Sequence, residues 1–453
     1  MFLKRISFLA TLGLIVLVPG YASAQNIEFI RDAEIENTIH TFAAPLFKQA
    51  GVEPDAVSIH LVKDQQINAF VAEGLNLFLN TGLIEKTQNA GQLIGVIAHE
   101  CGHIAGGHLV RGAGEMENAQ NESLASMVLG VLAAVAARRG DVGEAIMMGG
   151  NDMAMRSYLA ASRTIEGSAD TAALKFLDNL HMSGRGLLEF MEMLGTEERQ
   201  FTASQDPYVR THPLTRDRID EIRNHVEHSR WSDVPVPPEY VEPHQRIRAK
   251  LSAFLDPPGV TLLNYKEDDK SIAARYARAI AYYREPDLGH AIPLIDGLIA
   301  ERPKDPYFHE MKGQMLFENG RAVEAVPEYK LAVKYLPNNA LLRAELGQVE
   351  VETEDPAQLP DARTQLIAAT QRDPDNPDAW RLLATAYGRT GDVAMADASM
   401  AEYALLVGRW SEAMYDAGKA LRGLKQGTPV ALRMEDIRSQ AAQGLEAQKR
   451  RSR

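Results

Sequence analysis

Hydrophobic and polar residues alternate along residues 57–84 with the period of two that half-buried strands show. The alternation runs through VSIHLV and the second half of INAFVAEGLNLFLNTGLI. The two halves of this longer stretch meet at Glu73-Gly74, a signal for a two-residue hairpin turn. We therefore predict a small sheet. Its strand near Asn68, Ala69, Phe70, Val71 and Ala72 either only covers the core or forms an open edge with which an extended peptide could pair.

A buried helix is predicted directly after the sheet. Asn89 with Gln92 three residues on resembles a capping box, and GQLIGVIAHECGHIAGGHLV is apolar on two or more faces. A polar loop and an apolar run, 124–137, follow within residues 112–156. The run is too short to span a bilayer, so we interpret it as a core or lid helix, with shallow membrane contact as the alternative. Further helices are predicted near residues 157–180 and after the His212-Pro213 loop.

From about residue 272 the spacing becomes a repeat. Pro303 and Pro337 are 34 residues apart, which is the period of tetratricopeptide repeats. Small, aromatic and helix-ending residues recur in one phase through three units: Gly313, Ala325, Tyr329 and Ala332; then Gly347, Ala362, Ala369 and Pro374; then Trp380, Ala384, Tyr387 and Ala396. Because small residues let paired helices approach, the shared phase predicts an α-solenoid rather than a generic helical bundle.

These patterns together predict a mainly α chain with a small β-sheet. Residues 25–230 are expected to form one domain, 231–271 a linker and connecting helix, and 272–445 the repeats. The prolines of WSDVPVPPEYVEP, residues 231–243, indicate an extended linker.

Composition and charge narrow the class of protein. The 453 residues are 45% hydrophobic and 24% charged, as in globular proteins of two or three domains. A net charge of −13 argues against nucleic-acid binding, which needs clustered Lys and Arg. Residues 1–24 combine a basic start, an apolar segment and Ala22-Ser23-Ala24, as a cleavable signal peptide does. We therefore expect export, cleavage near Ala24, no membrane span and no internal disulfide, since Cys101 is the only cysteine.

His99-Glu100-x-x-His103 predicts a zinc site. Residues i and i+4 of a helix lie about 40° apart around its axis, so both imidazoles can face one ion. Zinc with three protein ligands keeps a position for water and lowers the pKa of that water. Glu100 can then take the proton of the water and return it to the leaving amine. Three fixed residues can match by chance, but histidines buried only for packing would be costly.

The third ligand has to come from another part of the chain. His108 lies about 140° further round the helix than His103, so it faces elsewhere. Leu109 stands where the longer three-histidine pattern needs its last histidine. Glu166 is the better candidate, with Asp170 on the same helix face to hold a ligand histidine through its ring N–H. The simpler interpretation is a solvated acidic pair, but the apolar residues around it indicate a mostly buried helix.

Several motifs in combination resemble one family. The chain resembles the HtpX/BepA-type zinc endopeptidases, which are relatives of the CAAX prenyl endopeptidases, in four motifs: HECGH, the downstream EGSAD, the hairpin sequence and the THP loop. Its repeats are similar to those of the periplasmic members of this family. The resemblance implies a metallopeptidase of the gluzincin type, with one Zn²⁺ on His99, His103 and Glu166 and with Glu100 as general base. It also implies a periplasmic endopeptidase of a Gram-negative bacterium, with chaperone-like activity. Its substrates would be misassembled outer-membrane proteins, and its repeats would contact the assembly machinery.

His212 has more than one interpretation. It is either a loop histidine beside the rigid Pro213 or, as the resemblance implies, a residue near the metal. There it would stabilise the oxyanion or occupy the open zinc position as a removable cap, and the resemblance favours the cap. For the whole chain, the alternative is a chaperone or adaptor that acts through its repeats while the metal site is autoinhibited. Glu100 and an open zinc position favour the peptidase.

Overall fold

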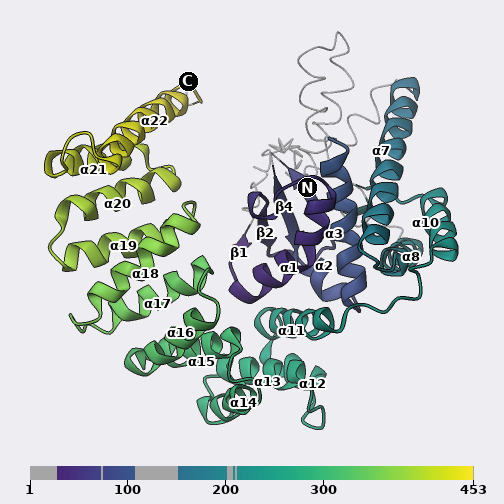
Figure 1. Ribbon diagram of the computed structural model, residues 1–453, viewed down its shortest axis with the longest axis horizontal. Coiled ribbons are helices and arrows are strands. Elements are labelled where there is room, and N and C mark those ends of the chain that lie inside the picture. Colours follow the sequence, from purple (N-terminus) through teal and green to yellow (C-terminus); the bar gives the residue numbers. More distant parts are fainter. Residues whose placement is uncertain (1–27, 73–74, 108–151, 201–207, 210–211, 452–453) are drawn as a thin grey trace, which may run out of the picture.

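The computed structural model describes residues 28–72, 75–107, 152–200, 208–209 and 212–451. The predicted signal peptide, the turn residues Glu73 and Gly74, and the predicted loop and apolar run up to residue 151 lie outside these ranges. The described part is mainly helical with one small sheet, so the predicted fold class is confirmed (Figure 1). None of the helices described is long and apolar enough to cross a bilayer.

Four short strands form one sheet in the order β1-β2-β4-β3. They are β1 (Phe29–Ile30), β2 (Ser58–Val62), β3 (Ala69–Ala72) and β4 (Asn76–Asn80). β2 and β4 run parallel, and β1 and β3 pair antiparallel with them at the two edges. The predicted two-residue turn was wrong: Ala72 pairs with Asn76, which leaves three residues between the paired positions. The carbonyl of Leu75, just before β4, accepts the Ser58 N–H of β2 at 2.9 Å.

The helices of the N-terminal part are α1 (Ala33–Gln49), η1 (Pro54–Ala56), α2 (Thr81–Lys86), α3 (Ala90–Ala105), α7 (Asp152–Asn179), α8 (Arg185–Gln200) and α10 (Arg216–His228). Among them, α1, α2 and α3 contact the sheet, α7 and α8 pack on α3, and α10 packs on α7 and α8 (Figure 1). α3 and α7 approach closely at Gly102, where an added Cβ would lie 2.5 Å from the Ala169 carbonyl oxygen. This approach sets the distance between the side chains that the two helices direct at each other.

The C-terminal part is a series of helix pairs. These are α13 (Ile272–Arg284), α14 (Leu288–Glu301), α15 (Pro306–Glu318), α16 (Ala322–Tyr335), α17 (Ala340–Glu352), α18 (Leu359–Arg372), α19 (Pro377–Arg389), α20 (Val393–Leu406), α21 (Trp410–Gly423) and α22 (Pro429–Arg451). They form an arc beside the N-terminal part (Figure 1). Gly313 lies against the Tyr329 ring and Gly347 against Leu366, so the predicted small residues do let paired helices approach.

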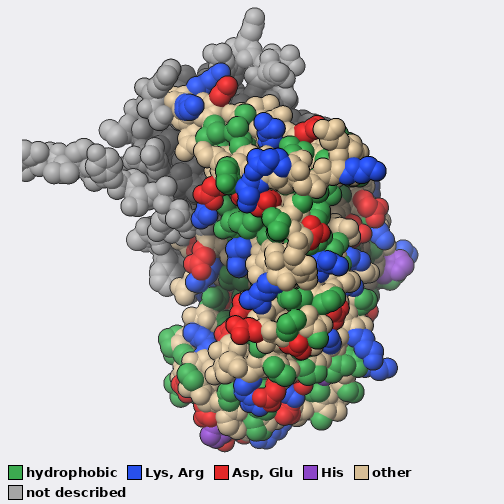
Figure 2. All heavy atoms as spheres, turned by 90° about the vertical axis from the view of Figure 1, so that its left-hand side faces the viewer, with side chains coloured by type: hydrophobic (Ala, Val, Ile, Leu, Met, Phe, Trp, Pro, Cys, Tyr) green, Lys and Arg blue, Asp and Glu red, His purple; other side chains and the backbone are tan. Residues whose placement is uncertain are grey.

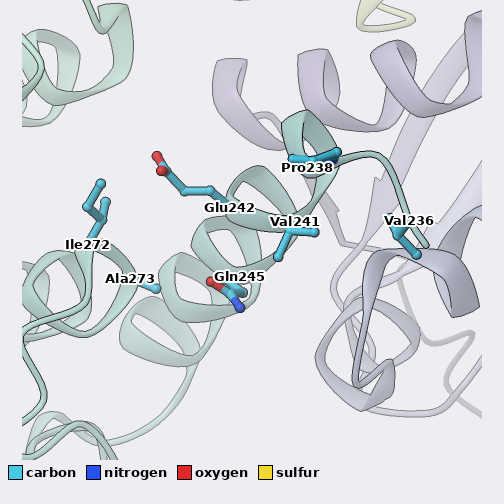
Figure 3. Close-up of a pocket in the computed structure, with 7 residues that line it drawn as sticks. All are labelled: Val236, Pro238, Val241, Glu242, Gln245, Ile272 and Ala273. Carbon is cyan, nitrogen blue, oxygen red and sulfur yellow. The ribbon is translucent and has the colours of Figure 1, made fainter.

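The predicted linker is partly wrong. α11 (Pro238–Leu255) begins inside the stretch 231–243 that was expected to be extended, and α12 (Pro258–Asn264) follows it. Proline is favoured in a first helical turn because its missing N–H has no partner to lose there. An open groove of about 440 Å³ lies between α11 and the start of α13 (Figure 3). It is lined by Val236, Pro238, Val241, Glu242, Gln245, Ile272 and Ala273, so it holds a single titratable side chain and no catalytic set.

Buried charges tie α11 to the start of α1. Four residues form what we call the interdomain clasp: Asp32, which caps α1, Glu34 of α1, and Arg246 and Lys250 of α11. Lys250 Nζ lies 2.8 Å from Asp32 Oδ2 and 3.4 Å from Glu34 Oε2, and Arg246 Nη2 lies 2.6 Å from Glu34 Oε1. Lys250 is 1% exposed. Burial alone would lower the pKa of Lys250, but Asp32 and the other carboxylates raise it well above its ordinary value.

The first repeats also contact the start of α1. The Tyr276 hydroxyl of α13 donates to Glu34 at 2.9 Å, and Lys250 lies 3.9 Å from Glu310 of α15. Ala33 packs in a hydrophobic cluster whose other members lie on α15, α16 and α17. The start of α1 therefore lies within the first repeats and is bound to them.

On the described part of the outer face of the repeats, neither positive nor negative side chains form a large patch (Figure 2). Figure 2 shows acidic, basic and hydrophobic side chains interspersed over the part of this face that is described. Such a face gives no long-range attraction to a charged polymer.

Candidate metal centre

α3 directs His99, Glu100 and His103 into the domain. Asn89 caps the start of this helix, as predicted, because its side-chain oxygen accepts the Gln92 N–H at 3.1 Å. The Gln92 side-chain oxygen in turn accepts the N–H of Gln88 at 2.8 Å and not that of Asn89. The Nε2 atoms of His99 and His103 lie 3.1 Å apart, and the side chain of His99 is fully buried. The spacing of four residues thus brings both imidazoles to one point.

α7 brings two carboxylates to the same point. Glu166 Oε2 lies 3.3 Å from His99 Nε2, and Oε1 lies 3.5 Å from His103 Nε2. Asp170 Oδ1 lies 2.8 Å from His99 Nδ1, which favours the proton on Nδ1 and leaves Nε2 to bind an ion. Glu166 is 4% exposed and Asp170 3%, so the interpretation as a solvated acidic pair is wrong.

His212 completes the group from a distant loop. Its Nδ1 lies 3.1 Å from Glu166 Oε2 and 3.3 Å from His99 Nε2. One ligand atom each of His99, His103, Glu166 and His212 lies within 4.8 Å of all the others. The second ring nitrogen, Nε2, lies 3.6 Å from Glu100 Oε1. The interpretation of His212 as a histidine of an exposed loop is wrong, because its side chain is buried among these groups.

Arg218 of α10 holds the two carboxylates in place. Its Nε and Nη2 donate to Asp170 at 2.7 and 2.9 Å, and Nη1 lies 3.0 Å from Glu166 Oε2. Nη1 also donates to the Pro213 carbonyl at 3.0 Å. A guanidinium is planar and has five donors, so it can fix both acids and the turn beside His212 at once.

The sequence prediction missed two residues here, Arg218 and Tyr208. Arg218 lies four residues before the buried Ile222, so its place on the inner side of an amphipathic helix was the available signal. Tyr208 is 1% exposed, and its ring lies 4.6 Å from that of His212, centroid to centroid. Tyr208 lies beside a predicted loop, and nothing in the sequence indicated that it would be buried.

Burial and neighbouring charges shift the pKa of His99, Glu166 and Glu100. Burial alone would lower the pKa of His99, but its hydrogen bonds to Asp170 and Glu166 raise it to about 10. Burial would raise the pKa of Glu166, yet His212 and His99 hold it well below its usual range. Burial raises the pKa of the Glu100 carboxyl. Perturbed groups that cluster in this way are typical of functional sites.

The donor set fits a zinc ion. Three ring nitrogens and one carboxylate converge from three separate elements, and all four residues are buried. Lone pairs that face one another at 3.1–3.5 Å repel unless protons or a cation lie between them. Histidine nitrogen and carboxylate oxygen are ligands that zinc commonly takes in a four-coordinate site.

Other predicted positions lie as follows. Cys101 is fully buried in the hydrophobic core, and burial raises its thiol pKa, which agrees with the role of a small apolar filler. His108 lies outside the described residues. β3, with Asn68 just before it, lies at an edge of the sheet and contacts α3, the helix with the HECGH motif.

Comparisons with known proteins match two successive parts of the chain to known families. Residues 30–226 match Peptidase family M48, and residues 276–340 and 316–384 match tetratricopeptide repeats. The chain therefore combines a peptidase family M48 domain with C-terminal tetratricopeptide repeats, and it is a metallopeptidase. The predicted resemblance is confirmed.

Particular relatives extend the match along most of the chain. The beta-barrel assembly-enhancing protease of Yersinia pestis is 23% identical over 402 residues, which cover 88% of this chain and 82% of the relative. The protein of the same name from Escherichia coli strain K12 is 22% identical over 406 residues, which cover 88% and 81%. Among solved structures, the tetratricopeptide repeat protein YrrB covers 38% of this chain and 89% of its own at 19% identity. Its TM-score of 0.32 is too low to bear on the fold.

Proposed function

We propose that this chain is a periplasmic zinc endopeptidase that acts in quality control and assembly of outer-membrane proteins. The observation that carries the proposal is the convergence of His99, His103 and Glu166 beside the buried Glu100. Relatives named beta-barrel assembly-enhancing protease over most of the chain support the biological setting. An exported chain, as the predicted signal peptide at residues 1–24 indicates, would meet such substrates.

His99, His103 and Glu166 would hold the ion. Zinc at this point would polarise a peptide carbonyl and lower the pKa of a water. Glu100 would act as general base and then carry the proton to the leaving amine. Asp170 would keep His99 in position, because it pairs with the ring Nδ1 of His99. Arg218 would keep Asp170 and Glu166 in position, because its guanidinium pairs with both carboxylates.

β3 would align the substrate. β3 is an edge strand among the described strands, and an extended polypeptide could pair with Asn68, Ala69, Phe70, Val71 and Ala72 as a further strand. Main-chain pairing depends little on side chains, which suits an enzyme that takes many misassembled polypeptides. The repeats would contact the assembly machinery or substrate, and chaperone-like activity would follow from that binding.

The alternative function is a chaperone or adaptor with a silent metal site. Its support is the position of His212 Nδ1 within the ligand group, which would leave zinc with four protein ligands. The relatives, which are named as proteases, favour the endopeptidase. We therefore propose that His212 is a removable cap on an active site.

Replacing His212 by alanine tests the cap. We expect kcat/KM for cleavage of an unfolded polypeptide such as casein to rise about tenfold, the change that 1.4 kcal/mol of capping free energy gives. His225→Ala, which removes a histidine of α10 that pairs with Asp178, should leave the rate unchanged. A fall of about 10²–10³-fold in His212→Ala would instead assign His212 to oxyanion stabilisation.

Metal analysis tests the site itself. The purified chain is expected to contain one zinc, and a chelator should abolish cleavage and lower the melting temperature, because an ion that binds only the folded state stabilises it. Asp170→Asn should weaken metal binding about 10- to 100-fold, as loss of a carboxylate that orients a ligand histidine does.

The matched control for the metal measurement is Asp178→Asn. Asp178 lies on the same helix but pairs with Ser229 and His225, so this variant should bind zinc as the parent does. Equal zinc affinity in Asp170→Asn and Asp178→Asn would contradict the assignment of the site.

A further inference from the structure

Tyr208 links the edge strand to His212 through its backbone. Its N–H donates to the Ile67 carbonyl at 3.2 Å, and its own carbonyl accepts the His212 N–H at 2.7 Å. Two successive hydrogen bonds thus lead from the beginning of β3 to the residue that faces the metal ligands.

The Ile67 carbonyl points to the side of β3 that faces away from β4. The Asn68 carbonyl accepts the Asn80 N–H of the neighbouring strand at 3.0 Å, so Asn68 faces inward. Backbone groups alternate in direction along a strand, so Ile67, Ala69 and Val71 face outward. The Tyr208 N–H therefore occupies one acceptor on the very edge that a substrate strand would use.

The Tyr208 side chain also bears on His212. The two rings are tilted by 30° with centroids 4.6 Å apart, and the Phe190 ring lies edge-on to Tyr208 at 5.6 Å. Tyr208 is 1% exposed and packs in the hydrophobic core. Since both rings are buried, the Tyr208 ring cannot shift without changing the contacts of His212.

We propose that Tyr208 is a positioning residue that holds His212 on the metal ligands until substrate reaches the edge strand. A strand paired with Ala69 and Val71 continues toward Ile67, two residues along, where it would compete with the Tyr208 N–H. Loss of that hydrogen bond would loosen Tyr208 and with it His212. This inference rests on the proposed function, and it makes substrate itself the signal that uncaps the site.

Amide hydrogen exchange tests the inference in a variant that keeps the hydrogen bond from the Tyr208 N–H to the Ile67 carbonyl. The full-length Glu100→Gln protein, loaded with zinc, is compared with and without saturating β-casein, with binding followed by anisotropy of labelled casein. We expect the amides of Tyr208 and His212 to exchange roughly 2- to 10-fold faster with casein, the change that loss of one hydrogen bond gives. Unchanged or slower exchange of both amides would overturn the proposal.

Variants with Co²⁺ in place of zinc provide the second measurement. Visible absorption of the cobalt protein reports the number of ligands, so Tyr208→Leu should match His212→Ala, whereas Tyr208→Phe keeps the ring and should match the parent. Val209→Ala, which removes a neighbouring buried side chain, is the control and should also match the parent. A spectrum of Tyr208→Leu that matches the parent would overturn the proposal. Failure of the proposed function would appear in a different measurement, as undiminished cleavage by Glu100→Gln.

Discussion

Glu100→Gln is expected to lower kcat for cleavage of unfolded polypeptide by about 10²–10⁴-fold, the usual contribution of a positioned general base. Glutamine has nearly the same shape, but its amide cannot accept the proton of a water. Glu100 lies next to His99 on α3 and is 1% exposed, so no bulk water replaces it as a base. The zinc content should stay unchanged, because Glu100 is not among the proposed ligands. Cleavage of casein, with zinc measured on the same sample, checks the expectation.

Glu189→Gln is the matched control for this prediction. Glu189 of α8 accepts hydrogen bonds from Asn89 and Gln92 at the start of α3. It is therefore a carboxylate that contacts the helix that carries Glu100, but at the end of that helix away from the histidines. Its replacement should leave kcat within about threefold, because one hydrogen bond contributes about 1 kcal/mol to stability and none of it to chemistry. If Glu100→Gln cleaves casein at the parental rate, the proposed endopeptidase function is refuted, and the chaperone or adaptor function remains.

The second large effect is expected at the interdomain clasp. Lys250→Met removes the cation that lies near Asp32, Glu34 and Glu310. Breaking a buried ion pair by removing one partner costs about 3–5 kcal/mol, because the remaining charge stays buried without compensation. We expect a correspondingly lower free energy of unfolding in urea, together with faster proteolysis near residues 231–237.

Lys312→Met provides the comparison for the clasp. Lys312 pairs with Asp296 and Glu328, but its side chain is 21% exposed and water can replace its partners. Loss of this more exposed cation should cost about 0–1 kcal/mol. Equal stability of Lys250→Met and Lys312→Met would show that the clasp does not hold the two parts of the chain together.

The sequence predicted most of the fold because its signals are local. Helix spacing placed His99 and His103 on one face, and the shared phase of small residues placed the repeats. The grouping of Glu166, Asp170 and His212 with them depended on motifs read in combination. Each of these signals lies within a few residues of the side chain that it concerns, where periodicity and capping operate.

The features that the sequence did not predict depend on contacts between distant elements. Arg218 is an ordinary surface residue until α10 packs against α7, and Asp32 and Glu34 look like the acids that any helix start favours. The proline-rich stretch was expected to be extended because of its proline content. The same content does not show that Pro238 begins a helix. Long-range partners change the role of such residues while leaving the local pattern unchanged.

The position of α1 bears on the order in which the molecule can fold. Arg31 pairs with Asp373 at 2.8 Å, a separation of 342 residues, and Glu34 pairs with Tyr276 across 242 residues. The start of α1 therefore leaves the ribosome long before its partners do. Contacts of such long range are slow to form, because a large loop must close first. Until α11 and the repeats have been made, the acidic helix start stays in water, and its ion pairs form only when those later elements pack against it.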